Sequence, residues 1–148
     1  MNNDDIRSQL KHYNHLFKKY NELFRVTSKK FNITENVLFI LYFLRDNENY
    51  TQKDLCDILF QPKQSVNSIL KKLESDGYVM LAFAQNSRKN KNIYLTEKGY
   101  ELAKQTSDKI AEAEISAFGM LSSRERHDFI NIFEHYISLL KTEIDNID

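Results

Sequence analysis

The 148-residue sequence contains one cysteine, one proline, three glycines and no tryptophan. A single cysteine excludes an internal disulfide framework and a zinc site built from cysteines. So few glycines and prolines exclude a collagen-like or linker-like chain and argue against a sandwich of many tightly connected strands. The longest apolar run, residues 37–44, is far shorter than the roughly 20 residues of a membrane-spanning helix. The first residues resemble no signal peptide, so we expect a cytoplasmic protein.

The composition is that of a single globular domain, with 41% hydrophobic and 28% charged residues. Acidic and basic residues are equal in number, 21 of each, but they are unevenly distributed. Residues 60–98 carry seven basic and three acidic side chains, whereas residues 99–148 carry five basic and ten acidic ones. The middle of the chain is therefore the segment suited to a polyanion, with basic clusters at residues 63–72 and 88–91.

Hydrophobic spacing predicts a series of helices in the first half of the chain. Apolar residues recur every three to four positions over residues 5–28. A second helix, residues 35–46, is apolar on most sides and should be central in the core. Thr51 and Asp54 resemble a capping box at the start of a short helix. The next helix should begin at Pro62, where a missing N–H costs nothing, and end at Gly77.

The pattern after Gly77 predicts a hairpin and two further helices. Residues 78–84 and 93–95 are rich in strand formers, and the intervening residues 85–92 are entirely polar. One long helix is expected over residues 97–118, and a Ser122–Glu125 capping box should begin the last helix. We predict a mainly α chain, α+β by class, with a winged helix-turn-helix lobe at residues 35–98. The apolar stripes of the terminal segments, 5–28 and 97–145, should pair with a second copy.

The exposed side of the helix after Pro62 carries the predicted function. Its non-core side chains either donate hydrogen bonds or both donate and accept them. They are Lys63, Gln64, Ser65, Asn67, Ser68, Lys71 and Lys72. Acidic residues follow only at Glu74 and Asp76. A helix fits the major groove of DNA, where Gln and Asn bond adenine edges, Ser bonds either base and Lys meets phosphates. We predict a recognition helix that contacts DNA through residues 63–65, 67, 68 and 71.

The polar tip of the hairpin is a second predicted DNA contact. It contains Ser87, Arg88, Lys89, Asn90 and Lys91. The tip follows the recognition helix by one short strand, which favours a phosphate or minor-groove contact over a merely flexible loop.

Three motifs resemble the MarR family of dimeric winged-helix transcriptional regulators. They are Leu55-x-x-x-Leu59 with Ser65-Val66, Leu73-Glu74-x-x-Gly77-Tyr78-Val79, and Leu95-Thr96-Glu97-Lys98-Gly99. The resemblance covers essentially the whole chain as a single domain, 1–148. It implies a homodimer that binds a pseudo-palindromic operator, usually as a repressor. The family's wing usually carries Asp-x-Arg where this sequence has Ser87 and Lys89.

The resemblance also implies release of DNA by a small phenolic or other aromatic ligand. The candidate pocket residues are the aromatic residues of the first two helices: Tyr13, Phe17, Tyr20, Phe39, Tyr42 and Phe43. Redox-sensing relatives place a reactive thiol in the first helix, where this chain has none, so we interpret Cys56 as a structural residue. His12, His15, His127 and His135 are interpreted as interface residues rather than metal ligands.

The sequence therefore predicts a sequence-specific double-stranded DNA-binding regulator of transcription that is not an enzyme. A Gly-rich phosphate loop, a catalytic Cys–His pair and a metal-ligand cluster are all missing from the sequence, so no cofactor or metal is expected. The alternative is a winged-helix protein-interaction module without DNA binding. That alternative predicts acidic or apolar residues on the exposed side of the helix after Pro62.

Overall fold

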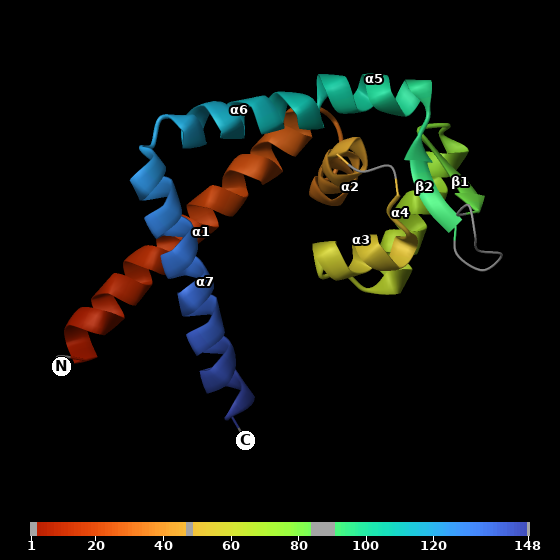
Figure 1. Cartoon of the computed structure of the whole chain (residues 1–148). Helices are drawn as coiled ribbons and strands as arrows, with labels where there is room; N and C mark the ends of the chain where they lie inside the picture. Colours follow the sequence, from red (N-terminus) through yellow and green to blue (C-terminus); the bar gives the residue numbers. More distant parts are fainter. Residues whose placement is uncertain (1–2, 47–48, 84–90, 148) are drawn as a thin grey trace. The chain divides into compact units, whose positions relative to one another are not determined.

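The computed structural model describes residues 3–46, 49–83 and 91–147, which form helices α1–α7 and strands β1 and β2 (Figure 1). The chain divides into two compact units, Met1–Lys109 and Ile110–Asp148. Helix α6 runs from the first unit into the second. None of the described helices is both long enough and apolar enough to cross a membrane.

Helix α1, Asn3–Lys30, is longer than the predicted 5–28, and most of its side chains are exposed. Only Phe24 and Ser28 of this helix are buried. Its apolar stripe (Ile6, Leu10, Leu16, Phe17, Tyr20, Leu23 and Val26) remains accessible. Phe24 packs against Phe39 of helix α2, with ring centroids 5.5 Å apart, which joins the end of α1 to the rest of the first unit.

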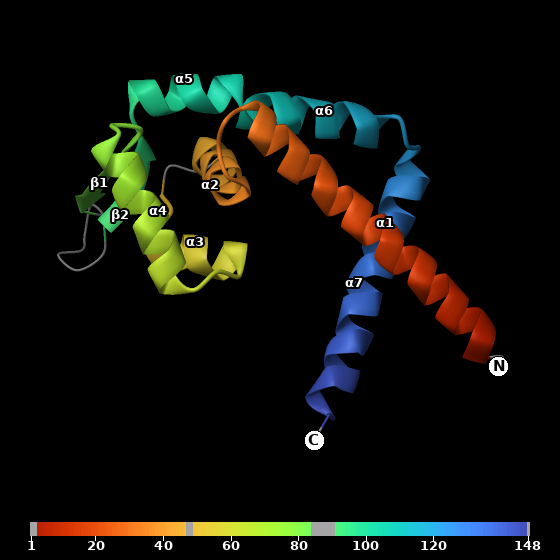
Figure 2. The same ribbon diagram turned by 180° about the vertical axis from the view of Figure 1, so that it is seen from behind.

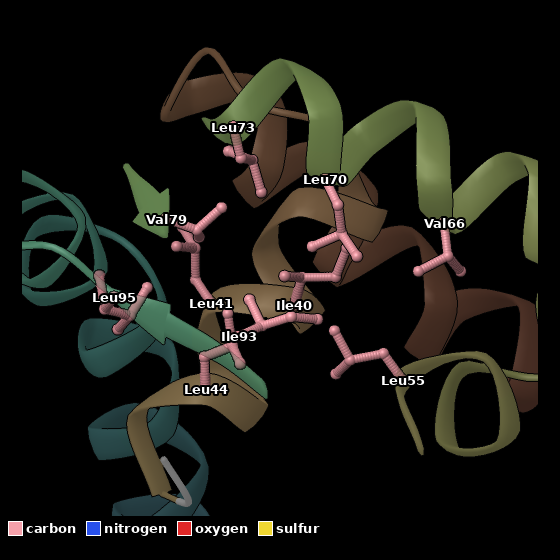
Figure 3. Close-up of a cluster of buried hydrophobic side chains, with 11 residues drawn as sticks. Ile40, Leu41, Leu44, Leu55, Val66, Leu70, Leu73, Val79, Ile93 and Leu95 are labelled. Atoms are coloured by element: carbon pink, nitrogen blue, oxygen red, sulfur yellow. The ribbon is translucent and has the colours of Figure 1, made fainter. Parts of the chain in front are cut away.

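The core of the first unit forms around helix α2, Glu35–Asp46, as the sequence predicts. Ile40, Leu41 and Leu44 of this helix are at most 1% exposed. Side chains from helix α3 (Gln52–Leu59), helix α4 (Lys63–Ser75) and the strands converge on them, as Figure 3 shows. The contributing residues are Leu55, Val66, Leu70, Leu73, Val79, Ile93 and Leu95. Burying this apolar surface is the main stabilisation of the unit.

Strands β1, Val79–Phe83, and β2, Lys91–Leu95, form an antiparallel pair. The register places Val79 opposite Leu95 and Phe83 opposite Lys91. The predicted strand 93–95 and loop 85–92 are therefore wrong at one end, because residues 91 and 92 belong to β2. Tyr50 extends the pairing, since its carbonyl accepts a hydrogen bond of 2.8 Å from the N–H of Ile93.

The single helix predicted over residues 97–118 is wrong, because the structure has helices α5, Glu97–Gln105, and α6, Ser107–Gly119. Thr106 separates them with φ −126° and ψ −84°. The Thr106 hydroxyl donates to the carbonyl of Leu102 at 2.7 Å, and the Ser107 hydroxyl donates to the carbonyl of Ala103 at 3.2 Å. Side-chain bonds of this kind compete with the backbone ladder and bend or break helices.

The second unit contains helix α7, Ser123–Asp145, which begins at the predicted capping box. The Glu125 side chain accepts a hydrogen bond from the N–H of Ser122 at 2.8 Å, and the N–H of Glu125 donates to the Ser122 hydroxyl. None of the described residues of α7 is buried. Its apolar side chains, including Phe129, Ile130, Ile137, Leu140 and Ile144, are exposed in the single chain.

Candidate nucleic-acid interface

Helix α3 is held in place by the Thr51–Asp54 capping box that the sequence predicts. The Asp54 carboxylate accepts hydrogen bonds from the Thr51 N–H at 2.8 Å and from the Thr51 hydroxyl at 2.6 Å. These bonds lower the pKa of Asp54, the hydroxyl contributing most. Because Thr51 also bridges to Asn92 of β2, the capping box joins the start of α3 to the hairpin.

A three-residue turn connects α3 to α4. Phe60 ends α3 in the left-handed region, with φ 50°, and its side chain is 92% exposed. The N–H of Gln61 donates to the carbonyl of Cys56 at 3.1 Å. The Gln52 side chain donates to the carbonyl of Lys63 at 3.3 Å, which joins the first turns of the two helices. Figures 1 and 2 show α3 and α4 side by side from opposite directions.

Helix α4 has one buried and one exposed face. Val66, Leu70 and Leu73 are at most 4% exposed and pack into the core. Gln64, Ser68 and Lys71 follow one another at helical spacing on the opposite face and are all exposed. Lys63 and Ser65 are also exposed, and Asn67 is half-buried at the edge of the exposed face. The structure therefore brings the six predicted recognition-helix residues onto one accessible surface.

The N-terminus of α4 adds backbone donors to that surface. Pro62 occupies the N-cap position, with φ −56° and without a side-chain cap, so the helix begins one residue later than predicted. The first N–H groups of an α-helix have no partner within the helix, and the helix dipole favours an anion beside them. The N–H groups at this end of α4 can therefore donate hydrogen bonds to a phosphate oxygen.

The other end of α4 is held by the start of α5, in an arrangement we call the clasp (Asp76–Tyr78 with Thr96–Gly99). Gly77 adopts φ +76°, as predicted for the residue that ends the helix. The Thr96 hydroxyl donates to the carbonyl of Gly77 at 2.6 Å. Lys98 Nζ donates to the carbonyl of Asp76 at 2.7 Å and lies 4.3 Å from the centre of the Tyr78 ring. The Leu-Thr-Glu-Lys-Gly motif thus fixes the C-terminal end of α4.

Gly99 completes the clasp through close backbone packing. A Cβ atom at this position would lie 2.0 Å from the carbonyl oxygen of Tyr78, a separation that no side chain tolerates. The same oxygen accepts a hydrogen bond of 3.0 Å from the N–H of Thr96. The motif needs glycine here because α5 touches the backbone that leads from α4 into β1.

The predicted wing residues lie mostly outside the described residues. Ser87, Arg88, Lys89 and Asn90 belong to the segment that is not described. Lys91 begins β2, is exposed, and has its Nζ atom 5.3 Å from the centre of the Phe83 ring. The described part of the hairpin therefore presents one cation next to an exposed aromatic ring.

The predicted ligand-pocket residues form three aromatic groups in the first unit. Tyr13 stacks on Phe17, and Tyr20 reaches Phe39 through Phe24, with ring centroids 5.0 and 5.5 Å apart in the latter chain. Tyr42 packs edge-on against Phe43. A cleft in the same unit is lined by other residues, which come from three separate stretches of the chain, 29–37, 68–78 and residue 102, and therefore carry no local sequence signal.

The remaining candidates are Cys56 and the possible metal ligands. Cys56 is half-buried and packs against the core of the first unit. Among the residues that the structure describes, no group of three or more His, Cys, Asp or Glu side chains could hold a metal ion.

The succession α2, α3, α4, β1, β2, with an exposed polar face on α4, defines a winged helix-turn-helix. A model of the MarR family matches residues 31–89. The HTH-type transcriptional regulator SarZ of Staphylococcus aureus is 29% identical over 101 residues, a match that spans 67% of this chain and 66% of SarZ.

Solved structures of the same fold cover nearly the whole chain. NMB1585, a MarR family regulator from Neisseria meningitidis, superposes with a TM-score of 0.78 at 19% identity, over 93% of this chain and 96% of that one. S. aureus MepR, in a structure of a MepR–DNA complex, superposes with a TM-score of 0.68 at 22% identity, over 86% of this chain and 97% of that one. Residues 31–89 thus match the MarR family, and the chain has the winged-helix fold of these solved MarR-family structures.

Proposed function

We propose that this protein regulates transcription by binding double-stranded DNA with α4 in the major groove. The observation that carries the proposal is the exposed face of α4, where amides, hydroxyls and lysines stand together and acidic groups follow only from Glu74 onward. The amides of Gln64 and Asn67 suit adenine edges, and Lys63 and Lys71 suit phosphates. The likeness to SarZ and to DNA-bound MepR supports this assignment.

The proposed active form is a homodimer on a pseudo-palindromic operator, and it acts as a repressor in the cytoplasm. The accessible apolar stripes of α1 and α7 support dimerisation, because contiguous exposed apolar surface usually marks an interface. Two-fold symmetry places two recognition helices about 34 Å apart, one turn of DNA. We also propose, from the family resemblance, that a small aromatic ligand near Tyr20 and Phe39 releases the DNA.

Selection of binding sites from random duplex DNA tests the proposed function. We expect enrichment of an inverted repeat whose half-sites are centred about 10 base pairs apart. The same protein should form a dimer in sedimentation, and phenolic compounds should release the selected duplex. The protein-interaction alternative, which the exposed face of α4 disfavours, predicts no enrichment and no salt-dependent affinity for DNA.

A further inference from the structure

The turn between α3 and α4 exposes an aromatic ring to solvent. Phe60 is 92% exposed, more than any other large apolar side chain that the structure describes. Cys56 and Leu59, which precede it in α3, pack against the core of the first unit. An aromatic side chain left in water forgoes the burial that usually stabilises it. Single exposed apolar residues are nevertheless common on protein surfaces, so exposure alone assigns no role to Phe60.

The backbone of Phe60 gives a second and independent observation. This residue has φ 50° and ψ 38°, in the left-handed region. The other described residues with positive φ are Asn32 and Gly77, whose residue types adopt this conformation readily. A bulky side chain is strained there because its Cβ atom approaches the following carbonyl oxygen. The turn therefore holds a phenyl ring at a position where both its exposure and its conformation are unfavourable.

The ring is not needed for the hydrogen bonds that form the turn. The N–H of Phe60 donates to the carbonyl of Cys56, and the N–H of Gln61 donates to the same carbonyl at 3.1 Å. Both donors belong to the backbone, and glycine provides the same groups at the end of a helix with less strain. A strained residue that the fold itself does not require indicates a contact with something outside the chain.

The position of Phe60 indicates what it contacts. It lies two residues before Pro62, the N-cap of α4, and three before Lys63, the first residue of the helix. Figure 1 shows the turn at the end of α4 that lies away from α5. Lys63 and Gln64 are exposed at this end, and the N-terminal residues of a recognition helix contact base edges. If α4 binds DNA as proposed above, on which this inference rests, the ring stands beside its base-reading end.

We propose that Phe60 contacts the C5-methyl group of a thymine in the major groove and makes each half-site specific for thymine at one position. A phenyl ring offers no conventional hydrogen-bond donor or acceptor, so it cannot read the polar groups of a base edge. The thymine methyl group is the apolar group that base pairs present in the major groove. Contact between the two removes apolar surface of both from water. Phe60 therefore adds an apolar reading position to the amides of Gln64 and Asn67.

Uracil substitution in the duplex selected by the wild type tests this contact, because uracil differs from thymine only by the missing methyl group. Each thymine is replaced in turn, in both half-sites, and the affinity of the full-length protein is measured by fluorescence anisotropy. At one symmetric pair of positions we expect the affinity to fall about fifteenfold. This is the product of two losses of about fourfold, one for each methyl group that is no longer buried.

Phe60→Gly should bind the thymine and uracil duplexes equally, with about the affinity that the wild type has for the uracil duplex. Its midpoint of urea denaturation should be unchanged or higher, because glycine relieves the strain of the turn. Phe60→Asn, which also suits the left-handed conformation, should lose the uracil penalty in the same way and decides the matter if Phe60→Gly does not fold. Gln64→Ala is the matched control, which should weaken binding to both duplexes but keep the full uracil penalty.

The outcomes separate this contact from the proposed function. The contact is overturned if the selected half-site holds no thymine, if uracil lowers wild-type affinity at no position, or if Phe60→Gly keeps the uracil penalty. Unchanged affinity of Phe60→Gly for the selected duplex also overturns it, leaves the ring to a protein partner, and leaves the proposed function intact. A protein that enriches no duplex overturns the proposed function and this contact together.

Discussion

At the residue scale, the requirement for glycine at position 99 comes from an approach between backbones. Gly99→Ala would place a methyl group 2.0 Å from the carbonyl oxygen of Tyr78, so α5 must move away from the end of α4. We expect a loss of about 3 kcal/mol in the free energy of unfolding, measured by urea denaturation. Gly119→Ala is the control, since its Cβ meets nothing within 4 Å and should leave stability unchanged or raise it by up to about 1 kcal/mol. Equal stability of the two variants would contradict the packing described for Gly99.

The capping box of α3 predicts a pH dependence of stability. Hydrogen bonds from Thr51 lower the pKa of Asp54 in the folded protein below its unfolded value, near 3.8. The ionised carboxylate therefore stabilises the fold above that value, and this stabilisation is lost as the pH falls through the lowered pKa. Asp54→Asn should cost about 1 kcal/mol at pH 7, and its difference from the wild type should shrink below about pH 4.

Urea denaturation at pH 7 and pH 3 measures this difference. Asp57→Asn removes the same charge from an exposed position on the same helix and should stay within about 0.5 kcal/mol of the wild type. A constant deficit for Asp54→Asn at both pH values would show that its charge does not stabilise the cap.

At the element scale, the sequence predicts helix ends best where one side chain bonds to the nearby backbone. Thr51 and Ser122 begin helices in capping boxes, and Gly77 ends α4 in the left-handed conformation, as their local motifs indicate. The exposed face of α4 follows equally from helical spacing, which places Val66 and Leu70 on the side opposite Gln64.

Features that depend on distant partners were not predictable in the same way. The hydrogen bond from Ile93 to Tyr50 joins residues 43 positions apart and has no local motif. The clasp brings Lys98 to the carbonyl of Asp76 only after the hairpin has folded back. Thr106 and Ser107 do carry a local signal, because adjacent hydroxyl residues within a helix can bond to carbonyls of the preceding turn, but apolar spacing across 97–118 outweighed it.

Substitutions of the phosphate-contacting and base-contacting residues of α4 should have two separable effects on DNA binding. Lys71→Gln should weaken binding to all duplexes and reduce the slope of log K against log salt by about 0.9, the contribution of one phosphate contact. Gln64→Ala should leave that slope unchanged and instead reduce discrimination at one base pair by about 1–3 kcal/mol. Fluorescence anisotropy over a range of salt concentrations, with the selected and a scrambled duplex, measures both.

Lys30→Gln is the charge control for Lys71→Gln, because it removes a lysine from the end of α1 rather than from α4. If Lys30→Gln lowers the salt slope as much as Lys71→Gln does, the phosphate contact cannot be assigned to α4.

At the scale of the whole molecule, the two units differ in how they bury apolar surface. The first unit has a core in which Ile40, Leu41 and Leu55 are fully buried. Helix α7 buries none of its described residues, although Ile137, Leu140 and others form an apolar stripe along it. Because exposed apolar surface of this extent is rare in monomers, we expect the stripe to be covered by a second copy in solution.

Charges placed on this stripe should therefore separate the dimer without unfolding the first unit. Leu140 and Ile144 of α7 are 41% and 53% exposed and lie one helical turn apart. Leu140→Glu/Ile144→Glu should be monomeric in sedimentation but keep the cooperative unfolding of the α2–β2 core. Loss of the second recognition helix should lower affinity for the selected inverted repeat by about 10²–10⁴-fold, because the two half-sites no longer bind as one unit.

Phe60→Glu, at a 92% exposed position on the turn before α4, should remain dimeric and thereby show that an added charge alone does not separate the chains. A dimeric Leu140/Ile144 variant with unchanged affinity would assign dimerisation to a surface other than α7.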